Sequence, residues 1–540
     1  MRLSGLISLF LIALLSSCVR PPERPDHLVF RYNEAAGISS LDPAFARNQA
    51  NIWAVNQMFD GLVAMNNDLQ VIPALAERWS VSDSGRLYIF TLRDSVYFHR
   101  APCFKSEAER LVEAADVVFS LERLRDPQLA APGAWTLSKV DSIFAPDRKT
   151  VGIRLTDPFP PFLSVLTMQY CSVLPREAIE YYGADFRAQP VGTGPFRFQY
   201  WLENEKLILR RNPRYYQRDS SGSRLPYLEA VAISFVPDKQ AAFLEFLKGN
   251  IDFISGLDAS YKDEILNYEG ALRKKYRAEF AVYRQPYLNT EYLGFLVDSS
   301  ASVTEGNPVL NKAYRQALNY CFDRRAMIRY LRNNIGTPAM AGMIPKGLPA
   351  FDTAEVPGYR YNPAKAKELL AQAGFPQGEG LPELTLQTNS SYLDLCEYLQ
   401  SEALKVGIPL RVEVTPPATL RQGMATAKVP FFRGSWIADY PDAENYLSLF
   451  YSKNWTPRGP NYTRFANPLF DGWYEQAIST TNDSLRIRLY QRMDSLVISE
   501  APVIPLYYDQ VLRFYRKGTK GLGGNALNLL DLTRVRKSRE

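Results

Sequence analysis

The chain has 540 residues, of which 46% are hydrophobic and 22% are charged, and its formal net charge is +6. This composition is typical of a folded globular protein and excludes a largely disordered chain, and the length predicts three or four folding units of about 150 residues each. Lysine and arginine are dispersed rather than grouped in runs, so nothing indicates a nucleic-acid partner.

The N-terminus has the pattern of an export signal. MRLSGLISLFLIALLSSC has a short basic start, an apolar run from Leu6 to Leu15 and then small residues. The apolar run is too short to cross a bilayer, which takes about 20 residues. The ending Leu-Ser-Ser-Cys18 resembles the lipobox of bacterial lipoproteins, in which cleavage occurs before a cysteine that then carries lipid. We therefore expect residues 1–17 to be a signal peptide and residues 18–27 a Pro-rich tether lipidated at Cys18, the alternative being a core or disulfide cysteine.

The next elements of the chain predict strands followed by helices. Residues 86–99, RLYIFTLRDSVYFH, are dense in β-branched and aromatic residues and follow the turn SDSGR, which predicts a strand pair. Residues 106–126 predict one or two helices with apolar positions at Leu111, Val112, Ala115, Val118, Phe119 and Leu121. In residues 307–333, helical spacing predicts a buried face made by Leu310, Ala313, Tyr314, Ala317, Leu318 and Cys321.

The second half of the chain alternates helices and strands. Residues 361–375 predict a helix that Asn362 caps, that begins at Pro363 and that ends in a left-handed Gly374. Residues 384–414 read as strand, helix and strand, which is a βαβ unit, and residues 499–517 predict a buried extended segment. The sequence therefore predicts an α/β protein with mixed sheets.

Residues typical of catalysis are scarce. The chain has two histidines, His27 and His99, although histidine is the usual general base and the commonest zinc ligand. P-loop, GxSxG and HExxH motifs are absent, and GLGG at 521–524 lacks the context of a dinucleotide site. Paired carboxylates come from distant strands, so an exported hydrolase of peptides or glycans stays open as an alternative. We expect a binding protein without enzyme activity, metal or cofactor.

The cysteines other than Cys18 leave two alternatives open. They are even in number and lack CxxC spacing, so metal and thioredoxin-like sites are not indicated. One or two disulfides and four buried thiols both fit Cys103, Cys171, Cys321 and Cys396.

Eight motifs follow one another along nearly the whole chain. They are LDPAFARNQANIWAVNQMFDGLV, IPALAERWSVSDSGRLYIFTLRDSVYFH, AADVVFSLERLRDP, VGTGPFRF, AYRQALNYCFDRRAMI, NPAKAKELLAQAGF, WIADYPDAENYLSLF and APVIPLYY. Each is weak alone, but their order resembles that of the oligopeptide- and dipeptide-binding proteins of ABC importers, solute-binding protein family 5. The resemblance implies a two-lobed periplasmic-binding-protein-like fold, type II and of the large cluster C type, with ligand bound between the lobes.

The resemblance also implies a domain arrangement. Lobe I would comprise residues 28–287 and 507–540, with an extra subdomain at about 66–194, and lobe II would comprise residues 288–506. The chain would cross between the lobes near Tyr287 and Tyr507. Hinge closure around ligand is expected of two packed bodies with short connections.

The segment RGSWIADYPD at 433–442 is the expected ligand-binding segment of lobe II. In peptide-binding relatives R-x-x-W-x-x-D-Y lies on the cleft wall, and Arg433, Trp436, Asp439 and Tyr440 match it position for position. The resemblance implies that Asp439 pairs with a peptide α-ammonium group and that Arg433 meets a ligand carboxylate. The backbone of the segment, which includes Ser435 and Ile437, would pair with the peptide main chain. The alternative for Asp439 is a turn or helix-capping residue.

On the other wall, the resemblance points to the loop AFARNQA and to one tryptophan. Arg47 and Gln49 occupy the positions that would face the ligand, where relatives can carry an acidic residue. Arg47 would either favour a short or carboxylate-bearing peptide or point to solvent. Trp135 falls near a pocket-lining region of the family.

These features together predict a monomeric, lipid-anchored substrate-binding protein on the periplasmic, extracytoplasmic face of a bacterial membrane. It would capture peptides and deliver them to an ABC permease in the inner membrane. The alternatives are another solute in the same fold, such as an oligosaccharide, an opine or a metal chelate, and the exported hydrolase.

Overall fold

The computed structural model describes residues 26–105, 110–256, 258 and 261–538. The predicted signal peptide, Cys18 and most of the tether lie outside these residues. In the part of the chain that is described, no helix combines the length and the apolar character needed to cross a membrane.

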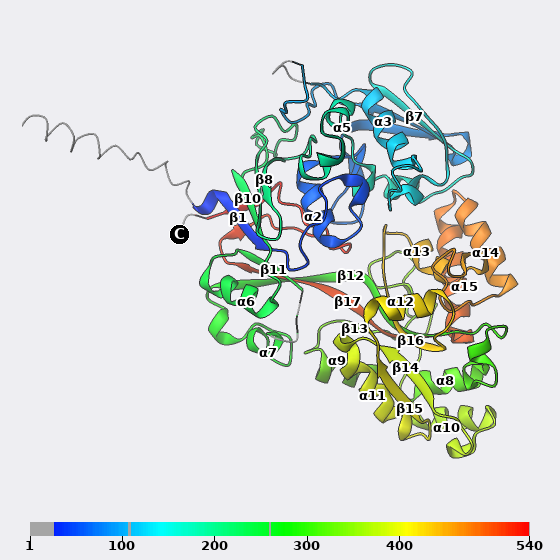
Figure 1. Ribbon diagram of the computed structural model, residues 1–540. Coiled ribbons are helices and arrows are strands. Elements are labelled where there is room, and N and C mark those ends of the chain that lie inside the picture. The colour runs from blue at the N-terminus through cyan, green and yellow to red at the C-terminus, as the bar shows by residue number, and fades with distance from the viewer. Residues whose placement is uncertain (1–25, 106–109, 257, 259–260, 539–540) are drawn as a thin grey trace, which may run out of the picture.

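One eleven-stranded sheet runs through both halves of the molecule (Figure 1). Its order is β15-β14-β16-β12-β17-β11-β1-β10-β9-β8, with β13 beside β17, so parallel and antiparallel neighbours are mixed. The strands are β1 Val29–Asn33, β8 Phe196–Leu202, β9 Lys206–Arg211, β10 Ala230–Ser234, β11 Phe253–Ser255, β12 Phe280–Phe295, β13 Thr337–Pro338, β14 Leu384–Thr388, β15 Leu410–Val414, β16 Phe431–Ile437 and β17 Val503–Arg516.

The two longest strands, β12 and β17, connect the halves. They pair antiparallel along most of their length, with register shifts after Pro286 and after Glu291. On one side β17 continues the sheet through β11 into lobe I, and on the other side β12 continues it through β16 into lobe II. Tyr287 and Tyr507, the expected crossing points, lie on these two strands. The residue limits given above for the lobes and the subdomain stay predictions.

Lobe I carries a second, four-stranded sheet in the order β4-β5-β7-β6. Its strands are β4 Ala76–Ser82, β5 Leu87–Leu92, β6 Val140–Phe144 and β7 Thr150–Leu155. The predicted turn joins β4 to β5, but residues 93–99 do not extend the pair, and Tyr97 makes only an isolated bridge to Leu111. The helices of this lobe are α2 Gln49–Met58, α3 Ala114–Arg125, α4 Phe162–Val165, α5 Arg176–Tyr182, α6 Lys239–Lys248 and α7 Lys262–Ile265.

Lobe II confirms the local predictions of the second half. The helix α10 begins at Pro363, its cap Asn362 accepts the Lys365 N–H at 3.0 Å, and Gly374 follows at φ 96°. The strands β14 and β15 pair in parallel around α11, which completes the βαβ unit. The helices are α8 Lys312–Tyr320, α9 Arg324–Leu331, α10 Pro363–Gln372, α11 Leu393–Leu404, α12 Pro417–Ala425, α13 Glu444–Leu447, α14 Pro468–Ser479 and α15 Asp483–Glu500.

Two buried arginines join α8 and α9 to the start of β17. The guanidinium of Arg315 donates to the Ala501 carbonyl at 2.9 Å, and that of Arg324 donates to the Pro505 carbonyl at 2.6 Å. Burial lowers the pKa of both guanidinium groups to about 10. These bonds explain physically why the motifs AYRQALNYCFDRRAMI and APVIPLYY occur together. The arginines of the first motif hold the backbone of the second motif in the sheet.

The predicted buried face of residues 307–333 also lies in the core of lobe II. Leu310 and Ala313 are half-buried, and the members packed in the core are Tyr314, Ala317, Leu318 and Cys321. The four cysteines whose state was left open are all free thiols, namely Cys103, Cys171, Cys321 and Cys396.

Candidate functional site

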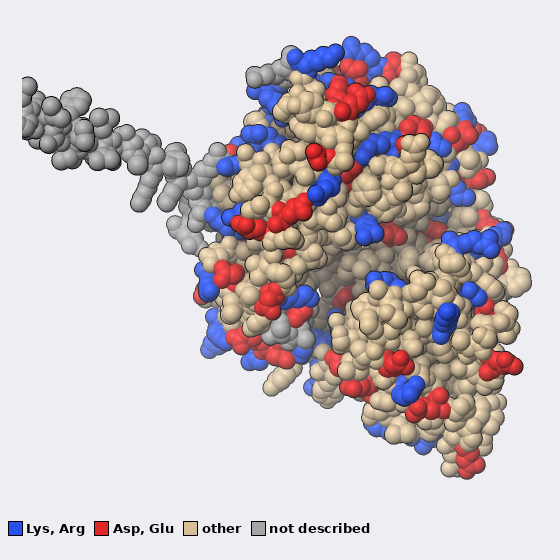
Figure 2. Space-filling view, viewed as in Figure 1, with Lys and Arg blue, Asp and Glu red and all other residues tan. Residues whose placement is uncertain are grey.

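A hollow separates the two lobes and is visible in the space-filling view (Figure 2). At one point the lobes touch through aromatic rings. Trp135, in the turn Ala134–Leu137 of lobe I, has its ring centroid 6.3 Å from that of Tyr440 in lobe II. Phe159 of lobe I meets the same tyrosine edge-on at 6.4 Å. Two of the predicted residues, Trp135 and Tyr440, therefore meet across the cleft.

Asp439, beside Tyr440, is exposed and has no cationic partner among the described residues. The surrounding protein nevertheless removes much of its hydration, which raises the pKa of its carboxyl group, while a hydrogen bond with Asn445 opposes the rise. The charge of Asp439 also acts on lobe I. The pKa of Tyr170 is raised to about 12, mainly by burial and to a smaller extent by the negative charge of Asp439, whereas the positive charge of Arg47 lowers it. Charges from both lobes therefore act on Tyr170.

The conformation of this segment is fixed by Asn445, the second residue of α13. Its side-chain oxygen accepts the indole N–H of Trp436 at 2.8 Å and the backbone N–H of Asp439 at 3.2 Å. The side-chain amide of Asn445 therefore fixes the positions of both Trp436 and Asp439. Asp439 does not cap α13, because the N-cap residue of that helix is Ala443, and the Glu444 N–H donates to Asp442 at 2.9 Å.

A buried carboxylate supports Tyr440 from behind. The hydroxyl groups of Tyr440 and Tyr474 both donate to Glu444, which is 6% exposed. Burial raises the pKa of Glu444, and these two hydrogen bonds oppose the rise. The ring that meets lobe I is therefore held from within lobe II.

The strand β16, which leads to Asp439, has one open edge. On one side it pairs with β12 from Phe431 to Ile437. On the other side β14 is registered against it at one position only, Gln387 against Phe432, and no further strand pair on that side is recorded among the described residues. Alternate residues between Arg433 and Ile437 direct their N–H and C=O groups away from β12. This edge can accept an added extended chain.

Arg433 already has an acidic partner within the protein. It forms an ion pair with Glu291 of β12, which is 2% exposed, and its guanidinium lies 3.2 Å from the ring centroid of Tyr392. Burial raises the pKa of Glu291, and Arg433 opposes the rise. A second pair, Arg332 with Asp509 at 3.2 Å, lies nearby. A ligand carboxylate would therefore share Arg433 with Glu291, and the predicted role of Arg433 stays a prediction.

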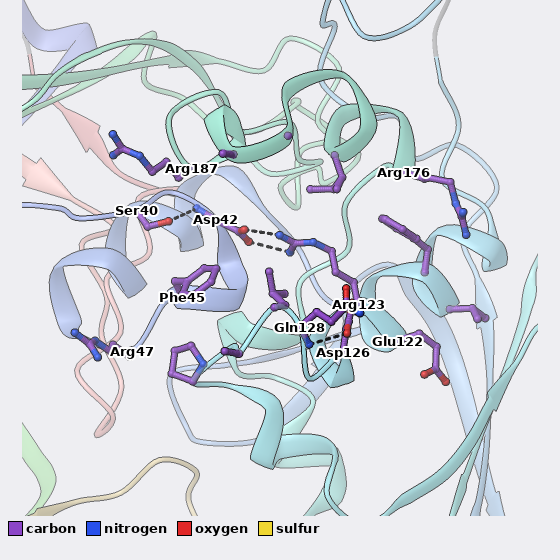
Figure 3. Close-up of a pocket in the computed structure, with 18 of the residues that line it drawn as sticks. Ser40, Asp42, Phe45, Arg47, Glu122, Arg123, Asp126, Gln128, Arg176 and Arg187 are labelled. Atoms are coloured by element: carbon purple, nitrogen blue, oxygen red, sulfur yellow. Dashed lines mark hydrogen bonds and ion pairs between the residues drawn. The ribbon is translucent and has the colours of Figure 1, made fainter.

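The two predicted residues on the AFARNQA loop do not line one pocket. Arg47 stands at the end of a cavity of about 1490 Å³ that lies wholly within lobe I, and it points away from the Asp42–Arg123 ion pair (Figure 3). Gln49 is exposed and lines a separate cavity of about 240 Å³ beside Trp53. The predicted roles of Arg47 and Gln49 in binding ligand stay predictions.

Sequence reasoning missed four residues of the site. Asn445 lies inside the motif WIADYPDAENYLSLF, and its position near the start of a helix was a usable signal. The other three, Phe159, Tyr170 and Glu291, come from segments without a local signature and reach the site only through the tertiary fold.

The chain has two lobes that share one sheet, and two long strands join them beside a hollow. This arrangement is that of the two-lobed extracytoplasmic solute-binding proteins. The chain belongs to the bacterial extracellular solute-binding proteins, family 5, because the profile of the family's middle region matches residues 70–457. The members of this family are binding proteins rather than enzymes.

Known proteins resemble the chain over nearly its whole length. It is 26% identical over 492 residues to the glutathione-binding protein GsiB of Salmonella paratyphi A, covering 90% of both chains. The periplasmic binding protein DppA from Helicobacter pylori, solved with the peptide STSA, has a TM-score of 0.76 at 24% identity and covers 95% of this chain and 98% of its own. HbpA2 from Haemophilus parasuis has a TM-score of 0.80 at 23% identity and covers 95% of this chain and 100% of its own. The expected fold is confirmed.

Proposed function

We propose that the protein captures peptides with a free amino terminus between its lobes and delivers them to an ABC permease. The observation that carries this proposal is the open edge of β16, which runs directly into an exposed carboxylate, Asp439, that lacks a cationic partner among the described residues. An extended peptide offers the two groups that such a site needs, a main chain that can pair with a strand edge and an ammonium group at its end.

The relatives support a peptide over the other solutes. DppA of Helicobacter pylori holds the peptide STSA, and GsiB is named for glutathione, which is a tripeptide. An oligosaccharide would leave Asp439 without a cation in a partly desolvated position, which costs free energy. Binding and release make or break no covalent bond in this scheme.

Binding would draw the lobes together. The aromatic contact of Trp135 and Phe159 with Tyr440 already joins the two walls. A peptide between Asp439 and the lobe I wall would contact both lobes only when the cleft is closed, so it favours the closed arrangement.

The anchor belongs to the same proposal. Cys18 becomes the first residue of the mature chain and carries lipid, with more than one acyl chain needed for stable attachment. Cys18→Ala should leave unprocessed precursor or release the protein from membranes, whereas Cys103→Ala should change neither. Intact-mass measurement of the mature protein gives the answer, and a mature chain that begins elsewhere contradicts the anchor without affecting peptide capture.

The ligand itself can be identified directly. The protein is purified without added ligand and denatured, and the released small molecules are analysed by mass spectrometry. Peptides with unmodified amino termini are expected. A sugar, an opine or a metal chelate as the main released species would overturn the proposal, and cleavage of added peptides by the native protein would favour the hydrolase.

A further inference from the structure

A cavity of about 430 Å³ lies in lobe I, away from the cleft. Its walls come from the loop that follows Phe98, from β8 and from the residues after β9. The strand β8 ends the large sheet on the side opposite lobe II. No lobe II residue lines the cavity, so it is separate from the peptide site. Its volume is within the range of small-molecule sites, about 300–1,000 Å³.

The lining of this cavity is strongly basic. None of the described residues that line the cavity is acidic. Four of them are arginines, namely Arg100, Arg110, Arg197 and Arg214. Arg110 is already neutralised, because it pairs with Asp116 at 2.7 Å and with Glu177 at 2.8 Å. The guanidinium of Arg214 lies over the ring of Tyr97, 4.4 Å from its centroid. The two cavity arginines outside such contacts are Arg100 and Arg197.

Arg100 and Arg197 are the groups left for a ligand. Both are exposed, and neither guanidinium group forms a hydrogen bond or ion pair with another part of the described chain. Two guanidinium groups on one cavity repel each other unless an anion lies between them. Arg197 also lies close enough to His99 to disfavour the charged imidazole.

The walls are held in place before any ligand binds. The backbone N–H of His99 donates to Gly192 at 2.8 Å, and its ring Nε2 lies 3.0 Å from the Gly194 carbonyl. The side chain of Asn212 donates to the same Gly194 carbonyl at 3.0 Å. A cavity fixed in this way loses little conformational entropy when a ligand enters.

Aromatic rings complete the site beside the charges. Phe98 and Phe104 both line the cavity, with ring centroids 6.5 Å apart. Phe98 is 5% exposed, and the Arg110 guanidinium lies over its ring at 5.8 Å from the centroid, so the accessible ring is that of Phe104. A flat apolar body can lie against Phe104 while its charged end meets the guanidinium groups. Guanidinium donors match the oxygens of phosphate and carboxylate groups in a bidentate geometry.

We propose that this cavity is a second binding site, independent of the peptide cleft, for a small organic anion that bears a phosphate or carboxylate group. The anion bridges Arg100 and Arg197, and its apolar part packs on Phe104. The phosphate could be carried by a free small molecule or by a lipid headgroup, since the proposed anchor keeps the protein at a membrane. The chemistry recognised is the same in both cases.

The test uses the whole mature protein in phosphate-free buffer, with phenyl phosphate, benzoate and phosphatidylglycerol vesicles as separate probes. Calorimetry and vesicle sedimentation compare the wild type with Arg100→Gln/Arg197→Gln. At least a tenfold weaker binding of one probe is expected in this variant. The charge-matched control Arg78→Gln/Arg148→Gln alters two arginines that are 70% and 80% exposed and lie outside the cavity. The control should bind as the wild type does.

His99 gives a second readout that does not depend on affinity. Burial lowers the pKa of its imidazole to about 4, and a bound anion would raise it. In a His27→Gln background His99 is the one histidine of the chain, so its NMR titration midpoint can be followed with and without probe. Binding of either small probe indicates a free ligand, and binding of vesicles alone indicates a headgroup. If no probe binds, or if the variant and its control bind equally, the site does not exist.

Discussion

Replacing Asp439 by Asn removes the charge that the proposed site offers to a peptide ammonium group. The substitution keeps the size of the side chain and a polar group near Asn445. Truncating one partner of a buried ion pair costs about 2–5 kcal/mol. Because Asp439 is exposed, we expect the lower end, about 2 kcal/mol, which is about a 30-fold weaker affinity.

Calorimetry with alanine peptides, from dialanine to pentaalanine, measures this effect. Each peptide is tested with a free and with an acetylated amino terminus against the wild type and Asp439→Asn. The four combinations form a double-mutant cycle that separates the pairing of Asp439 with the ammonium group from general damage to the cleft. Acetylation should weaken wild-type binding strongly and binding to the variant little.

The same pair predicts a pH dependence. Loss of hydration to the surrounding protein raises the pKa of Asp439, so its carboxylate is lost as the pH falls through that raised value while the peptide ammonium stays charged. Wild-type affinity should therefore drop on acidification, and Asp439→Asn should remove this part of the dependence. If acetylated and free peptides bind the wild type equally, Asp439 is not the ammonium site and the account of the cleft is wrong.

Three further predictions concern the lobes and their stability. Trp135→Ala removes a ring contact with Tyr440 between the lobes, which contributes about 0.5–1.5 kcal/mol. Peptide affinity should therefore fall about twofold to tenfold, and small-angle scattering should show a more open form. An unchanged radius of gyration and an unchanged affinity would contradict this prediction. Burial raises the pKa of Asp60 from 3.8 to about 6, so between these pH values the native state binds more protons than the unfolded state. The wild type therefore loses up to about 3 kcal/mol of stability as the pH rises from 3.8 to about 6. Urea unfolding of Asp60→Asn at several pH values should show that this part of the stability loss is gone. The part due to Asp494, whose pKa is also raised to about 6, should remain. If the stability of the variant depends on pH as that of the wild type does, the assignment to Asp60 is wrong. Arg513→Met should lower the free energy of unfolding by about 1–3 kcal/mol, because Arg513 is fully buried and its loss leaves the Leu529 carbonyl in the C-terminal tail without its donor. A thermal scan with no loss of stability would show that this bond contributes nothing.

Local patterns were sufficient where a feature depends on neighbouring residues. The helix from Pro363 to Gln372 has its cap, first proline and terminal glycine within one short stretch, and the structure has each of them in the predicted place. The βαβ unit around α11 was predictable for the same reason, since its periodicity changes at recognisable turns. The strand pair beside the SDSGR turn was predictable only up to Leu92, because the aromatic residues that follow belong to a loop.

The site depends on contacts that no local pattern reveals. Arg433 was identified from its motif, but its ion pair with Glu291 joins residues separated by 142 positions. The hydroxyl group of Tyr170 is influenced by the charges of Asp439 and Arg47, which are distant from it in the sequence and come near it only through the packing of both lobes. Sequence reasoning therefore identified the lobe II segment but could not determine which of its charges are already paired.

Hydrogen exchange along β16 tests the central claim most directly. Amides between Arg433 and Ile437 that face away from β12 have no strand partner recorded among the described residues. If a peptide adds to this edge, saturating free-amine peptide should slow exchange in this segment, and Asp439→Asn should reduce the protection at equal peptide concentration. Binding that is measurable by calorimetry but leaves exchange between Arg433 and Ile437 unchanged would contradict peptide capture on β16.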